Sequence, residues 1–337
     1  MACKVVILNW NGRRHLERFL PSVIATVPEG VEVVVADNGS EDGSCEFVER
    51  GFPTVRLIHL ERNFGYAEGY NLALAAPEVA DADICILLNS DVETPPGWVE
   101  PLVRKMEQEP DIGFLAPKIL SLDDRMRFEY AGASGGFIDG LGYPFCRGRI
   151  LSTVERDEGQ YDDARDVFWA SGACLVARMR AFGELGGFDA DFFAHMEEID
   201  LCWRAQLAGW RIAVEPASRV YHLGGGSLPV SPYKTYLNYR NNLAMLYKNL
   251  SGRSRVAVIS LRMIADGASA AVYLMTGKFS LMKAVLRAHR DYRRMKPELR
   301  AKRLEIQAGR KRGPYGIWRG SIILRYVFGG KRFCKLM

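Results

Sequence analysis

The sequence predicts an α/β fold with an open, largely parallel sheet, and its first 100 residues carry this prediction. Short apolar runs rich in Val, Ile and Leu alternate there with amphipathic stretches. Such runs are typical of strands buried on both faces, and strands that alternate with helices form right-handed βαβ units. Three of the runs end in polar segments, and open α/β sheets bind their ligands at such strand ends.

The elements follow in a regular order. We expect strands in KVVILNW, VEVVVADNGS, VRLIHL and ADICILLNSD, and helices from Arg13 to Ala25, around Cys45 to Arg50 and near Ala67 to Ala76. The segment from about 110 to 230 is less regular, and its glycine-rich part GASGGFIDGLGYPF is predicted to form loops. After Pro232 the pattern becomes helical, in YKTYLNYRNNLAMLYKNL and then from Arg255 to Thr276.

The composition is that of an ordinary folded protein. The 337 residues are 48% hydrophobic and 25% charged, which excludes disordered and collagen-like chains. Seven cysteines without a C-x-x-C pair indicate neither a zinc site nor a disulfide framework. The beginning, MACKVVILNWNG, lacks the basic stretch and apolar run of a secretion signal. We therefore expect a cytoplasmic protein.

The net charge of +5 hides an asymmetry along the chain. From Lys278 onward there are 18 Lys and Arg against 3 Asp and Glu, which leaves 27 basic and 37 acidic residues before it. A basic extension is typical of proteins with an anionic partner. The acidic body would repel nucleic acid, and no recognition motif is present, so we expect no nucleic-acid partner. The expected partner is an anionic membrane surface, with a second subunit as the alternative.

The apolar run from Arg255 to Thr276 is interrupted by Arg262 and Asp266. Charged side chains are costly at the centre of a bilayer. The run is therefore predicted to be an amphipathic or interfacial helix rather than a membrane span. Together with the basic extension, it predicts a peripheral protein on the inner face of the cell membrane.

Polar segments at three strand ends form the first candidate site. They are Asn9-Trp10-Asn11-Gly12, Asp37-Asn38-Gly39-Ser40 and Asn89-Ser90-Asp91. Turn and helix-cap chemistry explains each segment singly, but three together indicate a site. A carboxylate such as Asp91, emerging from a buried strand, can hold a hard divalent cation that bridges to a diphosphate.

The second candidate site is a cluster of acids before the predicted helix LCWRAQLAG. Glu197, Glu198 and Asp200 lie there in an aromatic setting. The helix dipole alone favours acids at this position, but neighbouring carboxylates also raise one another's pKa, which suits a general base. His222 follows another apolar run and precedes three glycines. It is either a structural histidine or a metal ligand beside backbone amides that approach a phosphate.

These segments, in this order, resemble the inverting family 2 nucleotide-sugar glycosyltransferases of the GT-A fold, especially their rhamnosyltransferase-like branch. The resemblance runs from Val5 to about Asn249 and rests on VVILNWNG, VVVADNGS, ERNFGYAEGYN, LLNSDVE, the Gly-Ala-Cys segment, MEEIDLCWR-x-x-x-AGW and VYHLGGGS. It implies a Rossmann-like mixed sheet. We expect a GT-A domain over 1–230, with a nucleotide-binding half at 1–100 and an acceptor half at 101–230, followed by a helical basic region over 231–337.

The resemblance also implies roles for single residues at the donor side. Asp37 would contact a uracil or thymine base or its ribose, with Asn9 and Asn11 in the same pocket. The residues implied to frame the nucleotide and sugar are Asn63, Gly65 and Asn71.

The implied metal site departs from the family pattern in one residue. The D-x-D motif stands here as Asn89-Ser90-Asp91, so an amide replaces the first acid. Asp91 and His222 are the implied ligands of Mg²⁺ or Mn²⁺.

The acid pair is Glu197-Glu198 where the family usually has Glu-Asp, so Glu198 falls on the base position. Glu and Asp have nearly the same reference pKa, so the chemistry survives the exchange. Trp169 and Asp200 are the residues expected on the acceptor side.

The implied reaction is a single displacement with inversion, in which Glu198 accepts the proton of the acceptor hydroxyl. The donor would be a UDP- or dTDP-linked sugar and the acceptor a glycan or lipid-linked hydroxyl, in cell-surface polysaccharide assembly.

Three other function classes are alternatives to this one. A Rossmann oxidoreductase requires G-x-G-x-x-G after the first strand, where this chain has Asn9-Trp10-Asn11-Gly12. A non-catalytic membrane- or nucleic-acid-binding protein would use the basic extension. An inactive transferase relative stays open because Asn89 and Glu198 depart from the usual residues.

Overall fold

The computed structural model describes residues 1–224, 231–252 and 254–333. Its main sheet confirms the predicted α/β fold. The strands lie in the order β11-β13-β6-β12-β4-β1-β2-β3, and β5 pairs with β13. Their bounds are β1 Cys3–Asn9, β2 Glu32–Asp37, β3 Arg56–His59, β4 Ile84–Asn89, β5 Val92–Glu93, β6 Ile112–Ser121, β11 Arg165–Asp166, β12 Cys174–Arg178 and β13 Arg211–His222.

The sheet is mixed. Strand β1 pairs in parallel with β2 and β4, whereas β12 runs antiparallel to both β4 and β6. The parallel strands place their carboxyl ends at one edge, and the four strands expected from the first 100 residues are all present.

Helices cover both faces of this sheet, in two hydrophobic clusters. On one face, α1 and α4 pack through side chains such as Leu16 and Leu102, and on the other α3 and α6 pack through Tyr70 and Trp203. The helix bounds are α1 Arg13–Thr26, α2 Ser44–Gly51, α3 Gly65–Leu74, α4 Val99–Gln108, α5 Met179–Glu184 and α6 Glu197–Ala208. The three helices predicted before residue 80 agree with α1, α2 and α3 to within two residues.

The glycine-rich segment predicted to form loops contributes strands instead. A second sheet has the order β10-β9-β8-β7-β14, formed by β7 Gly136–Asp139, β8 Pro144–Cys146, β9 Arg149–Ile150, β10 Thr153–Val154 and β14 Ile317–Trp318. Glycine is needed at Gly136 because a Cβ there would lie 2.0 Å from Cε2 of Trp169. The glycines permit close packing here rather than a loop.

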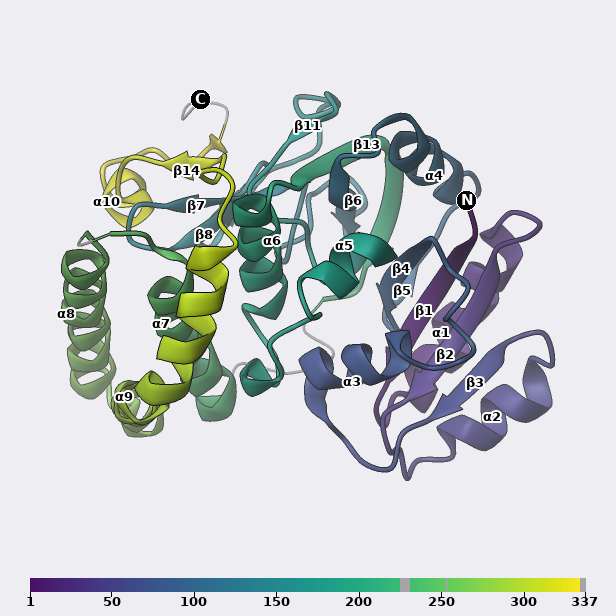
Figure 1. Cartoon of the computed structure of the whole chain (residues 1–337), viewed down its shortest axis with the longest axis horizontal. Coiled ribbons are helices and arrows are strands. Elements are labelled where there is room, and N and C mark those ends of the chain that lie inside the picture. Colours follow the sequence, from purple (N-terminus) through teal and green to yellow (C-terminus); the bar gives the residue numbers. More distant parts are fainter. Residues whose placement is uncertain (225–230, 253, 334–337) are drawn as a thin grey trace.

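The C-terminal region is helical, as expected, and is packed onto the rest of the chain. It contains α7 Pro232–Asn249, α8 Ser254–Met275, α9 Phe279–Ala308 and α10 Ile322–Val327. Figure 1 shows α7, α8 and α9 on one side of the molecule and β1 to β3 on the other. Tyr292, Leu299 and Ile322 belong to the hydrophobic cluster that covers the main sheet. The domain boundary expected at residue 230 lies outside the described residues.

Candidate active site

The polar ends of β1 and β2 lie together at the carboxyl edge of the sheet. Asn9 and Asp37 are neighbours in the strand register. Asn9 Nδ2 donates hydrogen bonds to Asp37 Oδ1 at 3.0 Å and to Ser40 Oγ at 3.2 Å. Asn9 Oδ1 is buried without a hydrogen-bond partner in the described structure. This edge therefore offers an acceptor oxygen beside a carboxylate.

Asn11 joins the turns that follow β1 and β2. Its Oδ1 accepts a hydrogen bond from the backbone N–H of Glu41, and its own N–H donates to Ser40 Oγ, both at 2.8 Å. Asn11 has a φ of 47°, a left-handed conformation that Asn tolerates better than most residues. Its contacts therefore hold the turn after β1 against the turn after β2.

Asn63 and Gly65 lie at the start of α3. Asn63 Oδ1 accepts hydrogen bonds from the N–H of Gly65 at 2.8 Å and from Asn38 Nδ2 at 3.2 Å. Gly65 has a φ of +78°, and a Cβ there would lie 2.5 Å from the ring of Phe193. This close approach brings the start of α3 against the segment that precedes α6.

Asn71 bonds the loop before α6. Its Nδ2 donates to the carbonyl of Phe188 at 3.0 Å, and its Oδ1 accepts from the N–H of Phe188 at 2.9 Å. A third hydrogen bond, of 3.0 Å, goes to Glu68. Through these contacts Asn71 anchors the loop before α6, and its expected place beside the nucleotide and sugar stays a prediction.

Strand pairing brings Asp91 and His222 together. His222 is in register with Val92, so the residue before β5 meets the end of β13. His222 Nε2 lies 3.1 Å from Asp91 Oδ1 and 3.5 Å from Asn89 Nδ2. The three residues expected at the metal site therefore meet. Of the glycines after His222, Gly225 and Gly226 lie outside the described residues.

Charge compensation dominates this end of the site. Burial opposes the charged imidazole of His222, but hydrogen bonds to Asp91 and Glu129 outweigh it and raise its pKa to about 10. Burial likewise opposes the charge of Asp91, and the hydrogen bond and charge of His222 outweigh it, so the pKa of Asp91 is lowered. Glu129 Oε1 lies 3.5 Å from His222 Nδ1.

Asp91 and His222 fit a divalent cation. Asp91 Oδ2 is buried and accepts no hydrogen bond within the described structure, and hard cations prefer such oxygens. No cluster of three or more His, Cys, Asp or Glu with metal-binding geometry occurs among the described residues. Two protein ligands are therefore on hand, and the rest of a coordination shell would come from phosphate oxygens and water, as is usual for Mg²⁺.

A second pair of carboxylates lies at the start of α6. Glu197 is buried and Glu198 is partly exposed, and in each the Oε2 atom has no hydrogen-bond partner in the described structure. Burial raises the pKa of Glu198 to about 7. Burial, followed by the charge of Glu198, raises the pKa of Glu197 well above its usual range. A carboxylate with a pKa near 7 and a free oxygen suits a general base at neutral pH.

The backbone before this pair is strained. Phe193, His195 and Met196 have φ values of 62°, 70° and 73°, and left-handed conformations are costly for residues other than glycine. Strain of this kind persists only where surrounding contacts fix the segment, and such segments gather at functional sites.

Asn241 of α7 and the start of α3 hold the strained segment from two sides. Asn241 Nδ2 lies within 2.9 Å of three backbone oxygens, those of Phe192, Ala194 and His195. From the other side, the N–H groups of Tyr66 and Ala67 donate to the carbonyl of Phe193, at 2.6 Å and 3.1 Å. Sequence reasoning missed Asn241; polar residues in the middle of the helical pattern YRNNLAMLY were the available signal.

The two residues expected on the acceptor side are buried, and their polar atoms bond other parts of the protein. Asp200 is 0% exposed and accepts from Arg204 Nε at 2.8 Å, Lys248 Nζ at 3.0 Å and Asn249 Nδ2 at 2.8 Å. Trp169 is buried, and its Nε1 donates to the carbonyl of Phe137 at 3.0 Å. Both assignments are corrected, because neither side chain is available to an acceptor.

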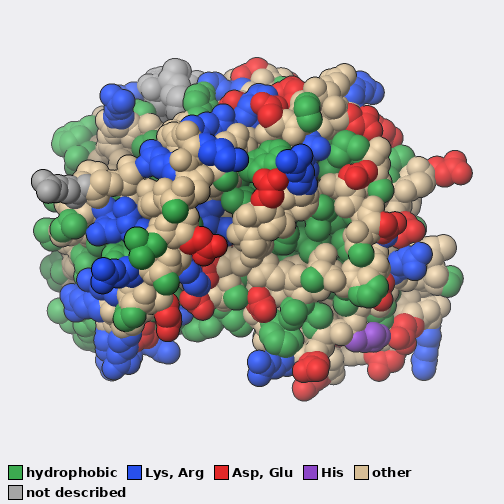
Figure 2. Space-filling model, in the orientation of Figure 1, with side chains coloured by type: hydrophobic (Ala, Val, Ile, Leu, Met, Phe, Trp, Pro, Cys, Tyr) green, Lys and Arg blue, Asp and Glu red, His purple; other side chains and the backbone are tan. Residues whose placement is uncertain are grey.

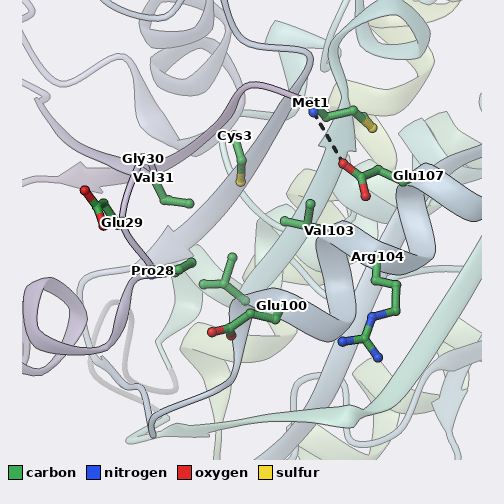
Figure 3. A pocket seen from close by; sticks show the side chains of 11 residues that line it. Met1, Cys3, Pro28, Glu29, Gly30, Val31, Glu100, Val103, Arg104 and Glu107 are labelled. Carbon is green, nitrogen blue, oxygen red and sulfur yellow. Dashed lines mark hydrogen bonds and ion pairs between the residues drawn. The ribbon is translucent and has the colours of Figure 1, made fainter.

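A separate pocket lies at the opposite end of β1. Figure 3 shows side chains from β1, α4 and the turn before β2 around it, with the N-terminal amine paired to Glu107. It lies at the amino ends of the strands, away from Asp91 and Glu198, and contains none of the expected site residues.

Comparison with known proteins points to one enzyme family. The family model described as glycosyl transferase family 2 matches residues 4–186. An N-acetylglucosaminyl-diphospho-decaprenol L-rhamnosyltransferase of Mycobacterium tuberculosis is 35% identical over 233 residues, covering 65% of this chain and 75% of that protein.

Solved structures extend the likeness to the fold. S. aureus TarS 1-349 has a TM-score of 0.56 at 15% identity, with 98% of this chain and 92% of that chain covered. The mannosyltransferase PcManGT from Pyrobaculum calidifontis, solved with GDP-Man and Mn²⁺, has a TM-score of 0.52 at 14% identity, with 86% of each chain covered. The expected GT-A fold is thereby confirmed.

Proposed function

The chain belongs to glycosyltransferase family 2, and on this premise we propose the reaction of its candidate site. It moves a sugar from a UDP- or dTDP-linked donor to a hydroxyl of a glycan or lipid-linked acceptor, with inversion, in cell-surface polysaccharide assembly. The observation that carries the proposal is the pairing of Asp91 with His222 at one end of the site, while Glu198 keeps a free oxygen and a raised pKa at the other.

Glu198 is the general base in this proposal. Its Oε2 accepts the proton of the acceptor hydroxyl as that oxygen attacks the anomeric carbon opposite the nucleoside diphosphate. A pKa of about 7 makes Glu198 basic enough to take the proton and still largely ionised just above neutrality. Glu197 lies deeper, and burial and the charge of Glu198 raise its pKa well above the usual range, which makes it the poorer candidate for the base.

Asp91 and His222 would hold Mg²⁺ or Mn²⁺, which neutralises the charge on the departing diphosphate when bound. His222 binds a metal only as the neutral imidazole, so binding releases a proton. Glu129 contacts Nδ1 and so directs Nε2 toward Asp91. A carboxylate behind a histidine ligand commonly has this orienting role.

The donor nucleotide is assigned to the edge formed by β1, β2 and the start of α3. Asp37 and Asn9 contact the base or ribose, and Asn11 forms the wall beside them. The residues that frame the nucleotide and sugar are Asn63 and Gly65, with Asn38 added because it links Asn63 to the carbonyl of Gly65.

The acceptor class is proposed from the M. tuberculosis relative. Its name specifies an acceptor sugar joined through a diphosphate to a polyprenol. We extend that class, a lipid-linked sugar diphosphate, to this chain. The transferred sugar is then a hexose or deoxyhexose such as rhamnose.

Turnover with a panel of donors tests the proposal. UDP-, dTDP- and GDP-sugars are first screened with Mn²⁺ by thermal shift, because a ligand that binds only the native state raises its apparent stability. The stabilising donor is then incubated with an alkyl-diphosphate-linked N-acetylglucosamine, and products are read by mass spectrometry. Transfer of one sugar is expected. Binding without transfer to any acceptor would instead support the inactive relative.

Membrane association is proposed through α8. It is the one helix among the described residues with the length and hydropathy of a span, at a mean hydropathy of 1.4. The two charges in the middle of the helix face inward: Arg262 Nε donates to Asp266 Oδ1 at 2.8 Å, and His289 Nε2 lies 3.2 Å from Asp266 Oδ2. The exposed large apolar residues of α8 are Val256, Leu261, Ile264, Val272, Leu274 and Met275.

This arrangement favours an interfacial position on an anionic bilayer. Basic side chains are exposed on the neighbouring α9, among them Lys283, Arg287 and Arg290. Figure 2 shows many basic side chains over the side that carries these helices. Each basic residue near an anionic surface contributes about 1 kcal/mol, screened by salt. A cytoplasmic enzyme placed so would meet lipid-linked acceptors at the inner face.

Liposome flotation tests the membrane proposal. The test variant is Ile264→Gln, at a residue that is 69% exposed. This variant should lose much of the binding of the protein to anionic vesicles at low salt. Met126→Gln, at a comparably exposed apolar residue before β7, is the matched control. Equal flotation of both variants, or equal binding to neutral vesicles, would contradict the proposal. Truncation at Gly277 is unsuitable because it removes Tyr292 and Leu299 from the core.

A further inference from the structure

Arg149 is a buried cation without a carboxylate partner. It begins β9 and is 6% exposed. Its Nη2 lies 3.3 Å from Cys146 Sγ, and its Nε has no hydrogen-bond partner in the described structure. Within the described residues, no Asp or Glu oxygen lies within 4.0 Å of its guanidinium nitrogens. A thiol is a weak partner for a guanidinium, which has five donors.

Arg149 lies beside the candidate site. Its guanidinium carbon is 4.6 Å from the ring centroid of Tyr130, the residue after Glu129. Glu129 contacts His222, so it connects Arg149 to the metal end. Cys146, which Arg149 touches, lies within the electrostatic reach of both Glu129 and Glu198. Since the ring of Tyr130 is 57% exposed, the guanidinium lies beneath a side chain that faces solvent.

A buried charge that forms no ion pair is costly, and a bound anion would add to the compensation that the ring of Tyr130 and the more distant charge of Glu129 give Arg149. Removing one partner of a buried ion pair typically destabilises a protein strongly because the other charge stays uncompensated. Arg also presents a planar fork that matches the oxygens of a phosphate. An arginine left in this state near a transferase site therefore has the chemistry of a phosphate ligand.

We propose that Arg149 binds a phosphate group of the acceptor, which makes it a determinant of specificity for phosphate-bearing acceptors. The inference rests on the proposed function. The donor diphosphate is assigned to Asp91 and His222, and Arg149 belongs to the half of the chain expected to bind the acceptor. Donor and acceptor both carry phosphate oxygens that an arginine could bind. The experiments below distinguish a phosphate of the acceptor from one of the donor.

Arg147 provides a matched control. It is equally buried, two residues away, but its guanidinium forms an ion pair with Asp163 and also bonds the carbonyl of that residue. Its charge is therefore already paired with a carboxylate within the protein. Replacing each arginine by Lys keeps the charge and removes the fork, so only Arg149→Lys should weaken anion binding.

The first experiment is binding of inorganic diphosphate in metal-free buffer, by calorimetry, with and without saturating UDP or dTDP. Arg149→Lys and Arg149→Gln should weaken binding by about tenfold or more, the usual scale for a charge-assisted contact. Arg147→Lys should match the wild type. Unchanged binding in both Arg149 variants, or complete competition by the nucleotide, would overturn the assignment to the acceptor. This readout needs no turnover, so it stands apart from any failure of the transferase proposal.

The second experiment compares two acceptors, one with and one without its diphosphate. Arg149→Gln should raise KM for the diphosphate-bearing acceptor about tenfold and leave KM for the phosphate-free acceptor and for the donor unchanged. A rise in the KM of the donor alone would reassign Arg149 to the donor and overturn the proposal. Retained melting temperature in Arg149→Lys, with the same loss in acceptor KM, excludes a merely structural role.

Discussion

The two ends of the candidate site differ in whether their buried charges are compensated by opposite charges. At the metal end, Asp91 and Glu129 flank His222, so opposite charges meet. At the base end, Glu197 and Glu198 are adjacent like charges, each with an unpartnered oxygen. The pKa of Asp91 is accordingly lowered, whereas burial raises the pKa of Glu198 to about 7.

The two ends also differ in how the chain builds them. Strand register alone brings Asp91 to His222, and neither residue has a positive φ. The base end follows three left-handed residues and depends on Asn241, which comes from a helix about 45 residues later in the chain. A metal site tolerates such simple assembly, whereas a general base with a raised pKa requires support against both strain and like charge.

The largest expected effect is loss of the base. Glu198→Gln should lower kcat by a factor on the order of 10² to 10⁴, the usual contribution of general base catalysis, while donor binding stays unchanged. Glu197→Gln should be milder because Glu197 lies deeper. The kcat values of both variants, measured at a saturating donor concentration, give the ranking. The reverse ranking would move the base by one residue.

Asp91→Asn tests the other end. It keeps the shape of the side chain but removes the carboxylate that a hard cation prefers. The Mn²⁺ concentration for half-maximal transfer should rise about 10- to 100-fold, at least the loss that outer-shell changes cause. Glu93→Gln, two residues along in β5, is the control. Identical Mn²⁺ titrations for Asp91→Asn and wild type would remove Asp91 from the metal site.

Asn241→Ala tests the support of the base end. Without its three backbone contacts the segment before α6 can relax, so kcat should fall about tenfold, as a displacement of the reacting groups by about an ångström can cost that or more. The KM of the donor should not change. Asn238→Ala, in the same helix, is the matched control, since its Nδ2 bonds the carbonyl of Lys234 within α7. Equal kcat in both variants, with equal loss of melting temperature, would reduce Asn241 to a structural role.

The contrast between the ends also explains what the sequence could reveal. Asn9, Asp37, Asn89 and His222 end strands, Asp91 follows β4 by two residues, and the ends of neighbouring strands meet wherever the sheet forms. Buried runs of apolar residues therefore predicted both the sheet and this half of the site. The pattern did not distinguish an acid in the site from one in the core, and so Asp200 was misassigned.

The remaining site residues depend on tertiary packing. Glu129, Arg149 and Asn241 come from three separate segments, and nothing in the local pattern of any one of them marks it as near Glu198. Trp169 is expected on the acceptor side from the sequence, but aromatic residues serve both binding surfaces and cores. Only its packing on Gly136 decides between the two.

The smallest expected effect, and the one that separates the two ends by pH, is on stability. The pKa of Glu198 is about 7 in the folded chain against a usual value of 4.5. Between these values the folded state holds a proton that the unfolded state has lost, so the free energy of unfolding falls as pH rises through this window. For His222 the window runs from 6.5 to about 10, again with stability falling as pH rises.

Glu198→Gln should therefore gain stability relative to wild type between pH 5 and pH 8, by about 1 to 3 kcal/mol, with no relative change from pH 8 to pH 9. Urea unfolding at each pH in metal-free buffer measures this difference. The exposed Glu100→Gln in α4 is the control and should follow the wild type throughout. If the free energy of unfolding of Glu198→Gln runs parallel to that of the wild type from pH 5 to pH 8, Glu198 has the same pKa in the folded and unfolded states. The base end would then lack the uncompensated charge that distinguishes it from the metal end.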